Sequence, residues 1–309
     1  MQQQIDGRRM LLGAALAFTG AILFSTKAVI VKLAYRYEVD SISLLALRML
    51  FSLPFFLAVA FLSRQQKQNR RLPIGRRDGL RILLLGVLGY YLASLFDFIG
   101  LKYITASLER LILFVYPTLV LLIGAVVYRE PISRRQLGAL LLTYLGIAIA
   151  FSEGLYLSGD QNFVLGAALI FSGALAYAAY IVGSGRLLPR IGTLRFTSLA
   201  MTASAAAVLA HHGIAYRWQL FGFPPEVYGL AALMALIATV LPSFLLSEGI
   251  RLIGSGNASI IGSVGPISTI VLAYFFLGER LGWLQWAGTA LVISGVLVIT
   301  LQKRRQAGG

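Results

Sequence analysis

The chain has 309 residues, of which 58% are hydrophobic and 13% are charged, and its mean hydropathy is +0.80. A soluble domain carries about a quarter charged residues, so this composition excludes an ordinary soluble protein and indicates an integral membrane protein. The net charge of +15 would suggest nucleic-acid binding in a soluble chain. Cysteine is absent, which excludes disulfides and thiolate chemistry.

Apolar segments follow one another along the whole chain, and each is long enough to cross the hydrocarbon core as a helix. None of the connections could hold a soluble domain, and the longest, 63–79, is dominated by Arg, Lys and Gln. The sequence therefore predicts an all-α integral membrane protein with ten transmembrane helices. The expected spans are 11–34, 41–62, 80–100, 104–128, 134–152, 162–184, 193–212, 226–248, 255–277 and 282–301.

The two halves of the chain repeat each other. Residues 12–24 read LGAALAFTGAILF and residues 165–177 read LGAALIFSGALAY. Further along, the offset between the copies becomes 149, which aligns Pro117 with Pro266. We assign 1–156 to the first repeat and 157–309 to the second. Because each copy holds five spans, an odd number, the second copy is inverted in the bilayer. Two inverted five-helix repeats are typical of secondary transporters, which bind substrate where the halves meet.

The distribution of basic residues predicts the orientation. With ten spans, both termini and the basic 63–79 connection share one face, which holds most of the Lys and Arg residues. The other face holds only Arg36, Lys102, Arg217 and Arg280. The positive-inside rule then predicts a multi-pass protein of the inner membrane with both termini in the cytoplasm. The basic excess is an insertion signal aided by anionic lipid, so we expect no nucleic-acid partner. We expect the first span to be retained, because it is too long for a signal peptide and lacks a cleavage motif.

No pattern in the sequence indicates catalysis. His211 and His212 are adjacent, so on a helix they point about 100° apart and would not chelate one metal ion. We interpret both as interfacial residues. A nucleophile elbow, a zinc-binding helix motif and a phosphate-binding loop are all missing from the sequence. We therefore expect no enzyme, no metal and no cofactor, and any pumping must use ion or substrate gradients.

Several short motifs carry a family resemblance over roughly residues 10–302. They are Lys32 at the end of the first span, Arg48 in Ala-Leu-Arg-Met, the run from Gly100 to Ser107 leading to Pro117, and Pro266 followed by Gly278-Glu279-Arg280. The pattern resembles the EamA-type permeases of the drug/metabolite transporter superfamily, and within them the YddG-type amino-acid exporters. The resemblance implies export of small metabolites. The first copy departs from it with Tyr128-Arg129-Glu130 in place of Gly-Glu-Arg.

Ionisable residues inside the first copy are the strongest signal for a site, because a charge within a span is costly and usually functional. Lys27 and Asp97 each lie 16 residues into an outward-running span, about 24 Å from its cytoplasmic end at 1.5 Å per residue. This equal depth predicts an ion pair, with Arg48 at a similar level. Glu109 and Arg110 lie near the outer end of a span, where we expect their side chains to snorkel to the interface.

Complementarity suggests what the site binds. The second copy lacks these charges and offers small polar residues instead, among them Ser243 and Ser263. A cation and a carboxylate that face neutral polar groups suit a zwitterion, with the substrate carboxylate on Lys27 and its ammonium on Asp97. A purely structural ion pair remains the alternative. The remaining candidate substrate-binding residues are Tyr90 and Ser94 on the helical face of Asp97, and Tyr116, Tyr177 and Tyr180.

Pro117 and Pro266 occupy equivalent mid-helix places, and we interpret them as hinges. The sequence thus predicts a secondary transporter or facilitator that exports amino acids or related small metabolites by alternating access, with its site between the repeats. The alternative is a multidrug or metabolite efflux permease of broad specificity. Lys27 stands where the small multidrug relatives have a buried glutamate, which argues against cationic drugs. The expected partners are a small-molecule substrate and the bilayer, with no obligatory protein partner.

Overall fold

The computed structural model describes residues 2–65, 74–129, 131–158, 162–185, 187, 191–262 and 264–307. Throughout this part of the chain the regular structure is helical. The first half holds α1 (Gln2–Tyr35), α2 (Ser41–Gln65), α3 (Arg76–Gly86), η1 (Val87–Leu92), α4 (Ala93–Gly100), α5 (Ala106–Leu113), α6 (Tyr116–Tyr128) and α7 (Arg134–Ser158). The second half holds α8 (Phe163–Ser184), α10 (Thr193–Tyr216), α11 (Pro225–Ala235), η2 (Leu236–Val240), α12 (Leu241–Gly262), α13 (Val264–Leu277) and α14 (Trp283–Ala307).

Length and apolar composition make most of these helices membrane spans, as predicted. Eight stretches within the described residues are long and apolar enough to cross a bilayer, and two shorter apolar helices, Val264–Leu277 and Trp283–Val298, follow them. Large apolar side chains remain exposed on the outside of the bundle, for example Phe275 at 75% and Trp283 at 80%. In water such a surface would be costly, whereas lipid tails solvate it. The chain is therefore an all-helical, multi-pass membrane protein.

The boundary predicted between residues 248 and 255 is wrong. The structure has one helix, α12, running through this stretch to Gly262. No proline lies between Gly249 and Gly262, and Gly249 packs so closely on α1 that an added Cβ would lie 2.9 Å from the Ala17 backbone nitrogen. This close approach needs a glycine, and it holds the helix against α1 rather than ending it there. At the corresponding point of the first half, residues 101–105 form a turn between α4 and α5.

Both halves contain a π-helical turn in the middle of a long helix. These turns, η1 and η2, begin at Val87 and Leu236, which are 149 residues apart (236 − 87). A π-helical turn has more residues than an α-helical turn, so it rotates the following side chains around the helix axis. The two halves thus share an irregularity at the offset that aligns their sequences.

Pro117 lies in the first turn of a helix, not in a helix interior as predicted. It is in the first turn of α6, and the chain has already left the preceding helix, since α5 ends at Leu113. In a first turn the missing proline N–H costs no hydrogen bond. Pro266 lies in α13, and residue 263 before this helix is outside the described residues. The sequence pattern shows the apolar run of the first half but not the break that precedes Pro117.

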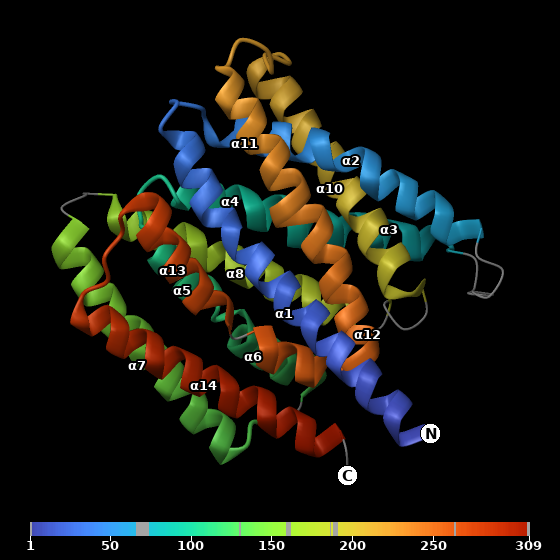
Figure 1. The fold of residues 1–309 in the computed structure, drawn as a ribbon, viewed down its shortest axis with the longest axis vertical. Coiled ribbons are helices and arrows are strands. Elements are labelled where there is room, and N and C mark those ends of the chain that lie inside the picture. Colours follow the sequence, from blue (N-terminus) through green and yellow to red (C-terminus); the bar gives the residue numbers. More distant parts are fainter. Residues whose placement is uncertain are drawn as a thin grey trace.

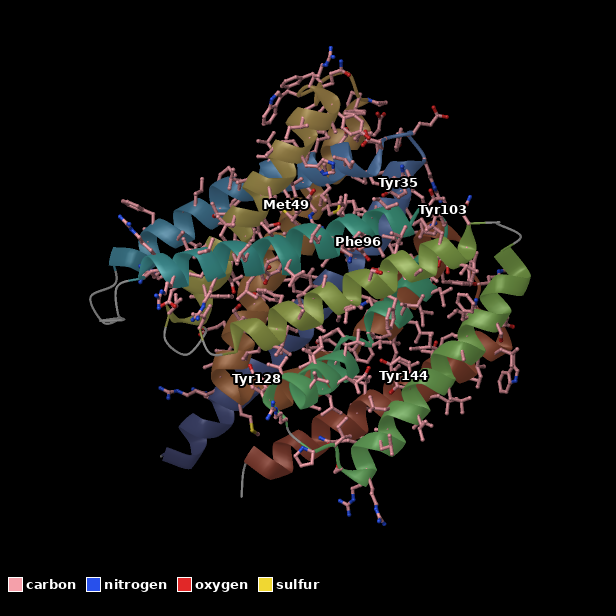
Figure 2. All side chains as sticks on the ribbon, turned by 180° about the vertical axis from the view of Figure 1, so that it is seen from behind. Tyr35, Met49, Phe96, Tyr103, Tyr128 and Tyr144 are labelled. Carbon is pink, nitrogen blue, oxygen red and sulfur yellow. The ribbon has the colours of Figure 1, made fainter. Side chains whose placement is uncertain are left out.

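The two halves of the chain pack closely together. Figure 1 shows α1 crossing the middle of the molecule, where it packs along α12 and α13 of the other half. α7 and α14 lie side by side at one edge, and α10 packs on α2 and α3. The two ends of the chain lie on the same side of the molecule (Figure 1). Figure 2 places Tyr35 and Tyr103 toward one end of the bundle and Tyr128 toward the opposite end. The predicted topology likewise puts Tyr35 and Tyr103 on one side of the membrane and Tyr128 on the other.

Candidate functional site

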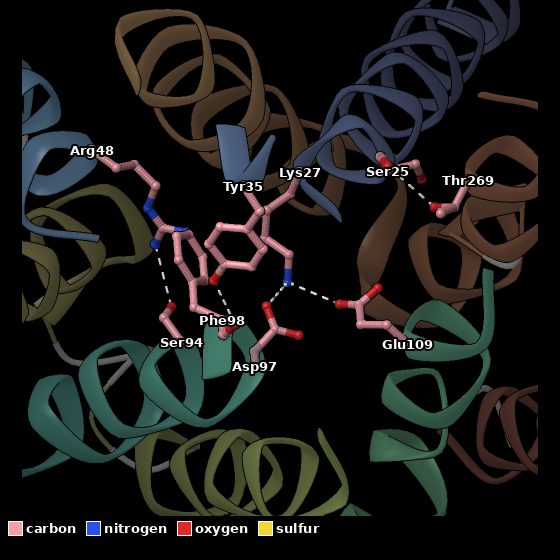
Figure 3. A network of polar contacts seen from close by, with 9 residues as sticks. All are labelled: Ser25, Lys27, Tyr35, Arg48, Ser94, Asp97, Phe98, Glu109 and Thr269. Atoms are coloured by element: carbon pink, nitrogen blue, oxygen red, sulfur yellow. Dashed lines mark hydrogen bonds and ion pairs between the residues drawn. The ribbon is translucent and has the colours of Figure 1, made fainter. Parts of the chain in front are cut away.

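Two carboxylates share one lysine in the middle of the bundle. Lys27 Nζ on α1 lies 2.6 Å from Asp97 Oδ2 on α4 and 3.2 Å from Glu109 Oε1 on α5, as Figure 3 shows. The ion pair predicted from the equal depths of Lys27 and Asp97 is therefore present. The second partner was not predicted. Glu109 is 0% exposed instead of snorkelling to the interface, because α5 turns it toward α1.

The short helix α5 owes its position to the other half of the chain. Thr105 caps it by accepting a hydrogen bond from the Leu108 amide at 3.2 Å. Glu279, which follows α13, accepts from the amides of Ala106 at 2.8 Å and Ser107 at 3.0 Å, and from the Ser107 hydroxyl at 2.7 Å. A carboxylate at a helix N-terminus is favourable because it meets free amides and the positive end of the helix dipole. Glu279 of the Gly-Glu-Arg motif thus fixes the helix that carries Glu109.

A carboxylate of the first half likewise binds the N-terminus of a helix in the second half. Glu153 at the end of the first half accepts a hydrogen bond from the Gln285 amide, at the start of α14, at 2.6 Å. Each half therefore supplies a carboxylate to a helix N-terminus of the other half. These contacts join residues more than 130 positions apart, and nothing in the local sequence predicts them.

Two further cations lie beside the Lys27 cluster. Arg48 is 4% exposed, and its Nη2 donates to Ser94 Oγ at 3.3 Å. Its guanidinium carbon lies 5.1 Å from the ring centroid of Phe98, a cation–π distance. Arg110 Nη2 donates to Ser25 Oγ at 3.5 Å. Three cations thus accompany two carboxylates, so the site carries one positive charge in excess when all five groups are ionised.

Several polar atoms of this cluster have no hydrogen-bond partner within the described part of the chain. They are Asp97 Oδ1, Glu109 Oε2 and the Nε atoms of Arg48 and Arg110. A buried polar group without a partner costs about 1–3 kcal/mol, and most proteins avoid it. The cluster therefore has acceptors and donors that a polar ligand could satisfy.

The four candidate tyrosines come together, as the sequence analysis grouped them. Tyr90 and Tyr180 lie with their hydroxyls 3.1 Å apart, and the rings of Tyr116 and Tyr177 are 5.3 Å apart between centroids. Tyr177 also stacks on Tyr180 at 5.8 Å. We call these four residues the tyrosine cluster. It is built by η1, α6 and α8, so it too draws on both halves of the chain.

The shared face expected for Tyr90, Ser94 and Asp97 is not kept. Tyr90 contacts Tyr180 on α8, Ser94 contacts Arg48 on α2, and Asp97 contacts Lys27 on α1. The π-helical turn η1 ends between Tyr90 and Ser94 and rotates the residues that follow.

Of the two candidate serines in the second half, the structure describes one. Ser243 lies on α12 and donates to the Thr239 carbonyl of the same helical stretch at 2.5 Å. Ser263 lies outside the described residues.

The two histidines contact different partners, as their adjacency predicts, but they are not both interfacial. His211 Nδ1 lies 2.8 Å from the Tyr91 hydroxyl. His212 is 0% exposed, lies 3.1 Å from Ser43 Oγ through Nε2, and stacks on Tyr216. The sequence could not show this burial, because it depends on α10 packing against α2.

The sequence profile of the EamA-like transporter family matches residues 11–152 and, a second time, residues 164–301. The chain belongs to the EamA-like transporter family. Among its relatives, the uncharacterized transporter YcbK of Bacillus subtilis is 32% identical over 304 residues, which is 96% of each chain. The uncharacterized inner membrane transporter YicL of Salmonella typhimurium is 26% identical over 234 residues, 75% of this chain and 76% of that protein.

The fold is also that of a solved crystal structure, with a TM-score of 0.63 over 95% of this chain and 98% of the other, at 18% sequence identity. Together with the membrane spans, the family makes this chain a multi-pass membrane transporter. The ionic and tyrosine clusters are then candidate parts of its substrate pathway.

Proposed function

We propose that this transporter is a secondary carrier or facilitator that exports amino acids or related small metabolites by alternating access. The observation that carries the proposal is the ionic cluster of Lys27, Asp97 and Glu109, buried where the two halves meet. Charges at this depth in a membrane protein are costly and usually mark a substrate or ion pathway. Opposite charges held close together suit a small zwitterion better than an apolar drug.

In this proposal the chain crosses the membrane ten times as two inverted repeats, residues 1–156 and 157–309. Three observations support it: the family profile matches twice, the two π-helical turns are 149 residues apart, and Pro117 in α6 and Pro266 in α13 are also 149 residues apart. Both repeats lie in one chain, so a monomer would contain a complete site and need no protein partner.

Pro117 and Pro266 are the proposed hinges. Near Pro266, Ser25 Oγ on α1 donates to the Gly265 carbonyl at 3.0 Å, and Thr269 Oγ1 donates to the Ser25 carbonyl at 3.2 Å (Figure 3 shows the second bond). A rigid-body movement of α13 against α1 would break these two side-chain hydrogen bonds. Such a movement would open the ionic cluster to one side of the membrane, as alternating access requires.

Transport by purified protein in liposomes tests the proposal. Vesicles would be screened for uptake of labelled amino acids, with and without a pH gradient. We expect uptake of a limited set of amino acids that saturates with concentration, because a carrier turns over through a finite site. Uptake equal to that of protein-free vesicles for every amino acid would contradict the proposal, and uptake that rises linearly would indicate a channel.

A broad-specificity efflux permease is the second candidate, and the tyrosine cluster favours it because aromatic surfaces accept varied ligands. In the same vesicles, a lipophilic cation would compete with amino-acid uptake if this candidate were correct. We expect no competition, because Lys27, Arg48 and Arg110 together repel a cationic ligand.

We place the protein in the inner membrane with both termini in the cytoplasm, and labelling of single cysteines tests this orientation. The natural chain has no cysteine, so an introduced one reports alone. Phe221 is 89% exposed between α10 and α11, and Ile132 is 37% exposed between α6 and α7. We expect Phe221→Cys to react with an impermeant thiol reagent in intact cells, and Ile132→Cys to react only after permeabilisation. The opposite pattern would invert the topology.

A further inference from the structure

Lys27 is poorly placed to bind the carboxylate of a substrate. Its ammonium already contacts Asp97 at 2.6 Å and Glu109 at 3.2 Å. A third carboxylate at Lys27 would lie close to both of these acidic groups. Like charges held this close in a site of low dielectric constant repel one another strongly. The attraction of one shared lysine would therefore be offset by two repulsions.

Arg110 is better placed for this role than Arg48, whose guanidinium is held by Ser94 and by the Phe98 ring. It forms no ion pair with any carboxylate in the part of the chain that the structure describes. Its Nε is buried without a hydrogen-bond partner there, and its hydrogen bond to Ser25 Oγ is long at 3.5 Å. A guanidinium presents a planar fork of donors that matches a carboxylate better than a lysine ammonium does.

The position of Arg110 links the parts of the candidate site. It follows Glu109 on α5, so its side chain leaves the helix about 100° away from that carboxylate. The guanidinium lies against the first turn of α13, where a Cβ on Gly265 would come within 2.7 Å of Nη2. Arg110 therefore links the helix that carries Glu109 to the helix of Pro266.

Building on the proposed function, we infer that Arg110, and not Lys27, binds the carboxylate of the transported molecule. The ammonium of the same molecule meets the unpartnered oxygens of Glu109 and Asp97, while Lys27 holds those two carboxylates in place. The ligand class is a small molecule that carries a carboxylate next to an amine. Binding at Arg110 also places the ligand against α13, the helix that the proposed movement displaces.

Two classes of amino-acid analogue test the carboxylate and the ammonium of such a ligand separately. N-acetyl amino acids keep the carboxylate and lose the ammonium, whereas amino-acid methyl esters keep the ammonium and lose the carboxylate. The measurement is the rise in thermal unfolding temperature of the purified protein in detergent when a mixture of either class, made from the twenty common amino acids, is added. A ligand that binds the folded state raises this temperature. The matched control is Arg134→Gln, which removes an exposed arginine on α7.

We expect both mixtures to stabilise the unmodified protein and Arg134→Gln. In Arg110→Gln the rise with N-acetyl amino acids should vanish while the rise with methyl esters remains, because only the carboxylate anchor is lost. In Arg110→Lys, which keeps the charge if Arg110→Gln does not fold, the N-acetyl rise should need at least about tenfold more ligand, since a lysine lacks the bidentate fork. Vesicle uptake of labelled amino acids should fall in Arg110→Lys and fall further in Arg110→Gln.

An unchanged response to N-acetyl amino acids in Arg110→Gln or Arg110→Lys would overturn the assignment. Loss of both responses would also overturn it, because it would make the arginine structural. If the unmodified protein responded to neither mixture and transported no amino acid, the proposed function itself would have failed. Amino-acid transport that survives Arg110→Gln would leave the proposed function standing and overturn this inference alone.

Discussion

Replacement of Lys27 by Met alone is expected to destabilise the folded protein by about 3–5 kcal/mol, because it strands two buried carboxylates without their shared cation. Adding Asp97→Asn should recover only part of this loss, since Glu109 remains buried without its lysine. The triple variant Lys27→Met, Asp97→Asn, Glu109→Gln should recover more stability than the double variant, because all three ionisable groups of the lysine cluster are removed together, while Arg48 and Arg110 keep their hydrogen bonds to Ser94 and Ser25. The unfolding temperature in detergent measures all three steps.

Lys102→Met is the matched control, because this lysine is exposed and its ammonium lies 5.8 Å from the ring centroid of Tyr35. Its effect should stay within about 0.5 kcal/mol. The triple variant also separates a binding site from a structural ion pair. A structural pair predicts a triple variant that folds and transports, whereas a substrate site predicts one that folds and does not. We expect the second result, and equal stability of Lys27→Met and Lys102→Met would show that the cluster is not paired in the membrane.

The second large effect is expected at the contact between α7 and α14. Gly146→Ala places a Cβ 2.7 Å from the Gly288 carbonyl oxygen, 2.8 Å from the Leu291 Cβ and 2.9 Å from the Val292 backbone nitrogen. These atoms belong to a helix backbone and cannot move aside individually, so the two helices must separate. Overpacking of this kind costs about 1–3 kcal/mol, and membrane helices depend on close small-residue contacts.

Gly138→Ala on the same helix is the control, because nothing lies within 4 Å of an added Cβ there. This substitution should leave the unfolding temperature unchanged or raise it slightly, because alanine favours a helix more than glycine does. If both variants unfold at the same temperature, the close approach of α7 and α14 is wrong.

Hydropathy and charge placement were sufficient to predict an all-helical, multi-pass membrane protein and the central ion pair. Each apolar run exceeds the length needed to cross the membrane, and the depth of a residue follows from counting along a helix. This is why Lys27 and Asp97 could be paired across 70 positions. Counting along a helix also explains why Tyr177 and Tyr180 could be grouped, because they lie one turn apart on the same helix.

Other features depend on contacts that no local pattern carries. Whether Glu109 reaches water depends on where α5 begins and on its anchoring by Glu279, which is 173 residues away from Ala106. The π-helical turn that separates Tyr90 from Asp97 has no distinctive composition. The place of Pro117 in a first turn depends on where α5 ends.

Counterflow tests most directly whether the ionic cluster is the substrate site of a carrier. Vesicles containing the unmodified protein would be loaded with an excess of an unlabelled amino acid that the uptake screen identifies, and then exposed to the same labelled compound. We expect a transient accumulation of label above equilibrium. A carrier that releases label inside the vesicle mostly rebinds the abundant unlabelled amino acid there and returns with it, so the label is retained. The triple variant of Lys27, Asp97 and Glu109 should insert and fold but show no overshoot. An overshoot of normal size in the triple variant, or none with the unmodified protein, would contradict the account.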